Sequence, residues 1–218
     1  MEKQVENGDV TQRYWAKQDF SQIPGTFSPS GKCRELLESS QCVLDLGCGA
    51  RALSAGPGRN ARTTVGVDIN ANALRHLATR DLNVFPVLAE ASMLPFRAQT
   101  FDAVLIVALM TVVPRYSDVE RIVCEVRRVL RPGGALYVGD FLFDPNSPTY
   151  RSRYRPEDPQ TLYAADEAGR PLYLARHWTE EELFSLTQGM RKESFEVSTA
   201  SSRSGNKLQG FEAIFRQP

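Results

Sequence analysis

Residues 43–49 of this 218-residue chain read VLDLGCG, and residues 65–70 read VGVDIN. Both stretches are apolar runs that close on an aspartate, Asp45 in the first and Asp68 in the second, and the first then breaks into a glycine-rich turn. Glycine lets the backbone approach a ligand closely, and a helix that starts beyond such a turn presents unpaired N–H groups. In a doubly wound sheet, the acid that ends the second strand is placed to accept hydrogen bonds from ribose hydroxyls. The two stretches therefore predict a site for a ligand that contains adenosine.

Strand and helix patterns alternate along the chain around these stretches. Short apolar runs favour strands and amphipathic runs favour helices, and their alternation is typical of a parallel sheet with right-handed crossovers. The predicted fold class is α/β, with a doubly wound, mostly parallel, Rossmann-like sheet of seven strands whose last strand is antiparallel. We expect strands at 42–46, 63–68, 83–88, 101–108, 135–140, 195–199 and 210–216, and helices at 33–39, 71–80, 119–130 and from 179, where Thr179 and Glu182 form a capping-box pattern.

The length of the chain suits one α/β domain. We expect an N-terminal helix and turn at 1–30, a cofactor-binding core at 42–140, a substrate-side insertion at 141–178, and a closing helix with strands at 179–218. The insertion carries several prolines and many aromatic and arginine residues, which interrupt the alternating pattern.

Composition excludes several classes of function. Lysine and arginine total 26, as do aspartate and glutamate, so the chain lacks the basic excess of a nucleic-acid-binding protein. The polar N-terminus is unlike a signal peptide, and no 18-residue apolar run offers a membrane span. The four cysteines have no CxxC spacing, which favours reduced thiols over disulfides or a metal site. We expect a cytoplasmic protein that acts without metal, membrane or nucleic acid.

The glycine turn leaves two kinds of cofactor open. Gly47 to Ala52 fits the G-x-G-x-x-A form of the dinucleotide fingerprint, with Asp68 at a suitable distance for the ribose of NAD. Asp45, however, stands two residues before the first glycine, where its carboxylate would repel a pyrophosphate. A cationic ligand with an ammonium group and no phosphate, such as S-adenosylmethionine, is favoured there instead.

Five motifs in order carry a family resemblance: VLDLGCGAR (43–51), VGVDIN (65–70), AEASMLPF (89–96), FDAV (101–104) and EVRRVLRPGGALYV (125–138). The set resembles the class I S-adenosylmethionine-dependent methyltransferases, and most of all the group that includes ubiquinone-type and small-molecule methyltransferases. The resemblance runs from about residue 42 to residue 140. The chain departs from the family pattern at Arg51, where many relatives have glycine, and in the interrupted segment 52–62.

The resemblance implies S-adenosylmethionine as cofactor and a role for single positions. The implied cofactor-binding residues are Asp45, Gly47 and Gly49 at the methionine end, Asp68 on the ribose hydroxyls, Ile69, Glu90 and Ala91 at the adenine, and Val107 near the sulfonium. It also implies in-line transfer of a methyl group to a small-molecule acceptor. A methyltransferase for protein or RNA, an NAD-dependent oxidoreductase and a binding protein without catalysis stay open as alternatives.

The acceptor side is less clearly marked. The segment 109–113 is apolar where many relatives have a histidine, so His177 is the candidate proton acceptor. The insertion follows the fifth strand, where loops carry specificity. We expect Tyr150, Arg153, Tyr154 and Arg176 to contact an acceptor that is aromatic or anionic.

Overall fold

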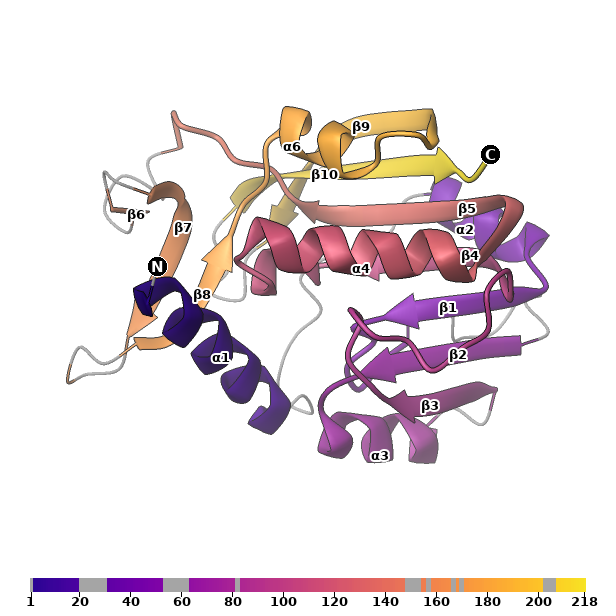
Figure 1. Cartoon of the computed structure of the whole chain (residues 1–218), viewed down its shortest axis with the longest axis horizontal. Coiled ribbons are helices and arrows are strands. Elements are labelled where there is room, and N and C mark those ends of the chain that lie inside the picture. The colour runs from indigo at the N-terminus through magenta and orange to yellow at the C-terminus, as the bar shows by residue number, and fades with distance from the viewer. Residues whose placement is uncertain are drawn as a thin grey trace.

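A computed structural model describes residues 2–19, 31–52, 63–80, 83–147, 154–155, 158–165, 168, 171–201 and 207–218. Its main feature is a seven-stranded sheet in the order β3-β2-β1-β4-β5-β10-β9 (Figure 1). The strands are β1 (Cys42–Leu46), β2 (Thr63–Asp68), β3 (Val84–Leu88), β4 (Phe101–Val107), β5 (Leu130–Phe141), β9 (Arg191–Ser201) and β10 (Lys207–Arg216). The first five run parallel, and β10 is antiparallel to both β5 and β9. The predicted fold class, including the antiparallel last strand, is confirmed.

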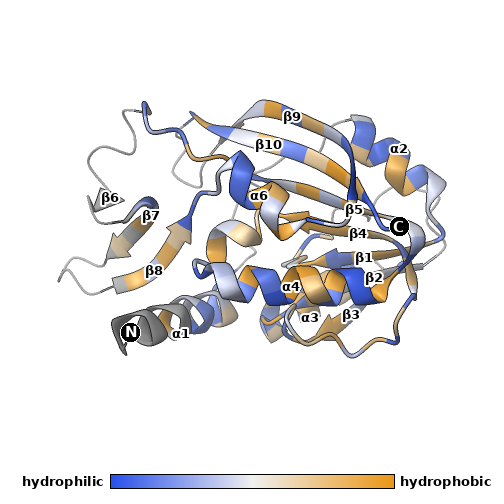
Figure 2. Ribbon diagram, turned by 45° about the horizontal axis from the view of Figure 1, so that its top comes forward, coloured by the Kyte–Doolittle hydropathy of each residue, from blue (hydrophilic) through white to orange (hydrophobic). Residues whose placement is uncertain are grey.

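Helices cover both faces of this sheet. On it pack α2 (Gly31–Ser39), α3 (Ala71–Arg80), α4 (Tyr116–Val129) and α6 (Glu180–Leu186). The helix α1 (Glu2–Lys17) packs instead on the insertion described below, and a 3₁₀ turn, η2 (Met110–Val112), follows β4. Apolar positions at helical spacing on α4, which Figure 2 shows between its polar positions, pack into the larger core with α6. The shorter α2 buries Cys33, Leu36 and Leu37 against the opposite face.

The insertion forms a second, three-stranded antiparallel sheet of β6 (Tyr154–Arg155), β7 (Asp158–Ala165) and β8 (Pro171–Arg176). The sequence pattern of the insertion does not predict these strands. Helix α1 lies along β8 (Figure 1), where the rings of Tyr14 and Tyr173 are 4.7 Å apart and Leu174 N–H donates to the hydroxyl of Thr11 at 3.0 Å. The small sheet is thereby joined to the N-terminal helix.

The C-terminal end of α1 is also fastened to the main sheet. Asn70 follows β2 and is fully buried. Its side-chain NH₂ donates to the carbonyl oxygens of Trp15 and Gln18 at 2.9 Å each. Its side-chain oxygen accepts N–H groups from the first turn of α3, as expected of a helix cap. One side chain thus joins α1, β2 and α3.

Among the described residues, no helix is both long and apolar enough to span a bilayer. The division of the chain into the four segments expected above stays a prediction.

Candidate functional site

The candidate site lies at the carboxyl ends of the parallel strands, beside β1. From β1 the strand order runs to β2 and β3 on one side and to β4 and β5 on the other. Doubly wound sheets bind their ligands at this change of direction. Asp45 of β1 pairs with Gly66 of β2 and is buried. Beyond it, the N–H groups of Gly47 and Cys48 both donate to the carbonyl oxygen of Val67, at 2.8 and 3.1 Å. The turn after β1 is therefore bound to the end of β2.

The two glycines of this turn adopt the left-handed conformation, with φ of +72° at Gly47 and +56° at Gly49. A side chain at either position would be strained. At Gly47 there is also little space, because an added Cβ would lie 3.0 Å from Cδ1 of Leu109. The side chain of Leu109, from the segment after β4, therefore rests on the glycine turn.

Asp68 joins the turn to the end of β2. Its two carboxylate oxygens accept N–H groups from Gly49 and from Asn70, each at 2.8 Å. Burial raises the pKa of Asp68, and the backbone N–H groups that it accepts oppose this rise. The backbone N–H of Ile69 also stabilises the carboxylate. A carboxylate has about four lone-pair sites, so Asp68 is still able to accept a hydroxyl group of a ligand.

The other predicted cofactor residues border the same edge. Ile69 is half-buried directly after Asp68. The N–H of Ala89 donates to the carbonyl oxygen of Asp68 at 3.2 Å, so the turn that carries exposed Glu90 and half-buried Ala91 starts beside β2. Val107 ends β4 and is half-buried between two apolar clusters. The structure thus brings the predicted cofactor residues to one edge of the sheet.

The predicted proton acceptor has an apolar environment. His177 is 2% exposed and its ring stacks on Phe141, with ring centres 5.2 Å apart and planes 14° apart. Burial lowers the pKa of His177 to about 4. The imidazole is therefore neutral near pH 7. The role of His177 as a proton acceptor stays a prediction.

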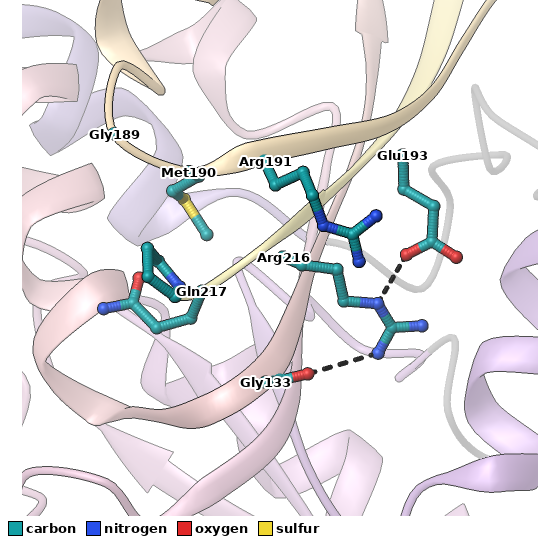
Figure 3. Close-up of a pocket in the computed structure, with 8 residues that line it drawn as sticks. Gly133, Gly189, Met190, Arg191, Glu193, Arg216 and Gln217 are labelled. Carbon is teal, nitrogen blue, oxygen red and sulfur yellow. Dashed lines mark hydrogen bonds and ion pairs between the residues drawn. The ribbon is translucent and has the colours of Figure 1, made fainter.

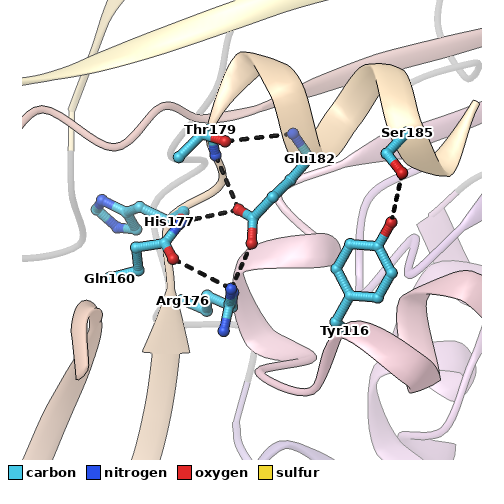
Figure 4. Close-up of polar contacts among 7 residues, drawn as sticks. All are labelled: Tyr116, Gln160, Arg176, His177, Thr179, Glu182 and Ser185. Carbon is cyan, nitrogen blue, oxygen red and sulfur yellow. Dashed lines mark hydrogen bonds and ion pairs between the residues drawn. The ribbon is translucent and has the colours of Figure 1, made fainter. Parts of the chain in front are cut away.

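Arg176 is engaged within the protein. Its guanidinium donates to Glu182 at 2.5 Å and to the amide oxygen of Gln160 at 3.2 Å (Figure 4). It also lies over the ring of Trp178. Glu182 also accepts the N–H of Thr179, which completes the predicted capping box of α6. This network connects β7, β8 and α6, so Arg176 positions the small sheet in this structure.

The remaining substrate residues stay predictions. Tyr150 and Arg153 lie outside the described residues. Tyr154 lies in β6, and its side chain is not described.

Sequence reasoning missed a third carboxylate at this edge, Asp140 near the end of β5. It is fully buried and accepts the N–H of Thr111 at 3.1 Å and that of Phe141 at 2.7 Å. Burial raises its pKa to about 7. The signal was present in the sequence, because YVGD at 137–140 is another apolar run that closes on an aspartate.

A separate hollow of about 710 Å³ lies at the opposite edge of the parallel strands (Figure 3). Gly133 before the paired part of β5 and Arg216 at the end of β10 border it, and Arg216 pairs there with Glu193 at 2.5 Å. Since the predicted site residues stand at the carboxyl ends of β1, β2 and β4, this hollow does not belong to the candidate site.

Comparison with known proteins concerns the same part of the chain. Residues 44–138 match the model of a family described as "Methyltransferase domain". The demethylmenaquinone methyltransferase of Tropheryma whipplei (strain Twist) is 34% identical over 102 residues, which are 45% of this chain and 41% of that protein. The chain therefore matches well under half the length of its curated relatives.

Two solved structures extend the likeness to most of the chain. A SAM-dependent methyltransferase from Methanosarcina mazei has a TM-score of 0.76 and 28% identity, over 88% of this chain and 99% of that one. The N-methyltransferase NodS from Bradyrhizobium japonicum WM9, solved with S-adenosylhomocysteine, has a TM-score of 0.60 and 15% identity, over 97% and 98% of the two chains. The second likeness shows a shared fold alone.

Proposed function

Since this chain belongs to the class I S-adenosylmethionine-dependent methyltransferases, we propose that it transfers a methyl group to a small organic acceptor by in-line displacement. S-adenosylmethionine supplies the electrophilic methyl carbon on a sulfonium sulfur. The protein holds this cofactor, aligns the acceptor with the carbon and excludes water.

The observation that best supports this proposal is the glycine turn between two buried aspartates. Asp68 accepts backbone N–H groups from the glycine turn and from Asn70, and we propose that its remaining acceptor capacity serves the ribose hydroxyls. Asp45 is 2% exposed on the neighbouring strand. A carboxylate there attracts ammonium and sulfonium groups and repels a pyrophosphate, which favours S-adenosylmethionine over NAD.

We assign the cofactor roles as follows. Asp45, Gly47 and Gly49 bind the methionine end, and Asp68 accepts the ribose hydroxyls. Ile69, Glu90 and Ala91 border the adenine, and Val107 lies near the sulfonium.

The acceptor that we propose is aromatic or anionic. The curated relative from T. whipplei is named for demethylmenaquinone, a small molecule. Here, Tyr14, Trp15 and Tyr173 form an aromatic cluster where α1 meets β8, and α1 ends against the residue that follows Asp68 and Ile69. Flat aromatic rings suit such a surface. His177 stays our proposed proton acceptor, suited by its low pKa to an acceptor that is itself acidic.

Calorimetry with S-adenosylhomocysteine and with NAD tests the cofactor. We expect binding of the first and none of the second, and tight binding of NAD would overturn the proposal. We expect Asp68→Asn to weaken S-adenosylhomocysteine binding by about 10- to 100-fold, the loss of one hydrogen bond to a charged group.

Asp102→Asn is the matched control for this variant. The carboxylate of Asp102 also accepts two backbone N–H groups, those of Gln41 and Cys42, but at the start of β4 on the opposite edge. We expect its cofactor affinity to equal that of the wild type.

A second experiment tests transfer. Incubation with tritiated-methyl S-adenosylmethionine and a small-metabolite extract is expected to label an organic product. Cofactor binding with no label in any fraction would favour a binding protein without catalysis. Loss of at least tenfold in kcat in His177→Phe, with unchanged S-adenosylhomocysteine affinity, is expected if the imidazole accepts the proton, and an unchanged kcat would remove it from the mechanism.

A further inference from the structure

The segment after β4 follows a strained path. Ala108 has a φ of +50°, a left-handed conformation that is unfavourable for a residue with a side chain. Its N–H donates to the carbonyl oxygen of Gly139 at 2.8 Å, and the chain then enters η2. Such a turn persists only where neighbouring groups hold it.

Leu109 stands in this turn, directly after Ala108. Its side chain lies against Gly47, since a Cβ added to Gly47 would come within 3.0 to 3.4 Å of Cδ1, Cβ and Cγ of Leu109. Gly47 belongs to the methionine end of the proposed cofactor site. Leu109 is therefore the residue of the segment after β4 that packs on the glycine turn.

Asp140 holds the same segment from the next strand. Its Oδ2 accepts the N–H of Thr111, within η2, while its Oδ1 accepts the N–H of Phe141. Side chains alternate along β5, so Asp140 points to the face where Leu136 and Val138 join the core with α4. Phe141, with His177 stacked on it, points to the other face. Asp140 and His177 are thus on opposite faces of the sheet and serve different purposes.

A fully buried carboxylate is unfavourable unless its hydrogen bonds offset the loss of water. The hydrogen bonds of Asp140 go to its own strand and to the turn after β4. We infer that Asp140 is a positioning residue of the methyl-transfer site, which holds the turn after β4 so that Leu109 stays seated on Gly47 at the methionine end of the cofactor. This inference rests on the proposed function.

The inference distinguishes two parts of the cofactor. A displaced Leu109 changes the site of the amino-acid portion, while Asp68 and the adenine side stay in place. S-adenosylhomocysteine contains both portions, and 5′-methylthioadenosine lacks the amino-acid portion. The ratio of their dissociation constants therefore reports on the methionine end alone.

Asp140→Asn is the first variant. Thr111 and Phe141 donate to different oxygens, so one of these N–H groups would face the NH₂ of asparagine, which cannot accept. We expect the affinity for S-adenosylhomocysteine to fall about tenfold, which is about 1.4 kcal/mol, with the affinity for 5′-methylthioadenosine changed less than about twofold. Asp102→Asn makes the same substitution at the opposite edge of the sheet, in an aspartate whose Oδ2 accepts two backbone N–H groups and whose Oδ1 pairs with Arg131, and should leave the ratio unchanged.

Leu109→Ala is the second variant. Because it removes no buried charge, it tests the same contact with Gly47 even if Asp140→Asn lowers the stability of the fold. It should raise the ratio of the dissociation constant of S-adenosylhomocysteine to that of 5′-methylthioadenosine, and Asp140→Asn should then add little in the Leu109→Ala background. Equal losses for both ligands, or an unchanged ratio in either variant, would overturn the inference. A wild-type protein that binds neither ligand would instead refute the proposed function.

Discussion

Gly47 offers the sharpest test of how the glycine turn is built. Substitution by alanine introduces a Cβ at a φ of +72° and places it 3.0 Å from Cδ1 of Leu109. These are two separate penalties, one from the backbone and one from the neighbouring side chain. Gly133→Ala separates them, because Gly133 has a φ of +74° and its added Cβ would meet nothing within 4 Å.

The magnitudes follow from these two sites. The left-handed conformation costs a residue with a Cβ about 1–2 kcal/mol, and this applies to both variants. Overpacking adds roughly 1–3 kcal/mol, and this applies to Gly47→Ala alone. For a chain of this size, each kcal/mol lowers the melting temperature by about 2–4 °C. We expect Gly133→Ala to lose a few degrees and Gly47→Ala to lose about twice as much.

Thermal unfolding of the two variants, and of each combined with Leu109→Ala, measures this directly. Leu109→Ala makes room for the new Cβ, so the double variant Gly47→Ala/Leu109→Ala should be more stable than the sum of the single effects predicts. Gly133→Ala should show no such coupling. If Gly47→Ala is no less stable than Gly133→Ala, the contact between Leu109 and the glycine turn is refuted.

Three further predictions concern the elements around the site. His177→Phe preserves a ring on Phe141 and removes a group whose pKa is lowered to about 4 in the folded state, from an ordinary value of 6.5. The wild type loses up to about 3 kcal/mol of stability as pH falls from 6.5 to 4, and urea titrations should show that the variant lacks this loss. Glu182→Gln weakens the ion pair with Arg176 and the cap of α6, and calorimetry should show a loss of about 1–2 kcal/mol that Glu180→Gln on the same helix does not reproduce. Asn70→Asp retains the cap of α3 but loses both hydrogen bonds that the side-chain NH₂ donates at the end of α1. Amide hydrogen exchange should therefore become faster in α1 and not in α3, and equal rates in α1 of the wild type and the variant would contradict this role of Asn70.

The sequence predicted the main sheet closely because its pattern reflects burial on both faces. Strands at 42–46 and 63–68 and the helix at 71–80 have the predicted bounds, and the capping box at Thr179 is confirmed. The second sheet was missed because β7 and β8 lie between turn-forming and charged residues and each begins at or next to a proline. Their stability depends on partners far along the chain, such as Thr11 and Tyr14 of α1, which local patterns do not reveal.

Arg176 shows the same limit at a single residue. An arginine among aromatic residues suggests recognition of an anion, and the sequence contains no sign that Glu182 and Gln160 reach it first. The helix cap was predicted from spacing, but its second use, as the partner of an arginine on β8, depends on how the small sheet docks. Local chemistry was therefore easier to predict than contacts between elements.

The three aspartates at the carboxyl edge show why equal sequence patterns lead to different chemistry. Asp45, Asp68 and Asp140 each stand at or next to the end of an apolar strand. Asp68 accepts N–H groups from the glycine turn and from the cap residue of α3, while Asp140 accepts one from the turn after β4. The turn after β1 and the turn after β4 are in contact through Gly47 and Leu109. Asp68 of β2 therefore holds the first turn, and Asp140 of β5 holds the second. A substitution of Asp68 should therefore weaken binding of the ribose, and a substitution of Asp140 should weaken binding of the amino-acid portion.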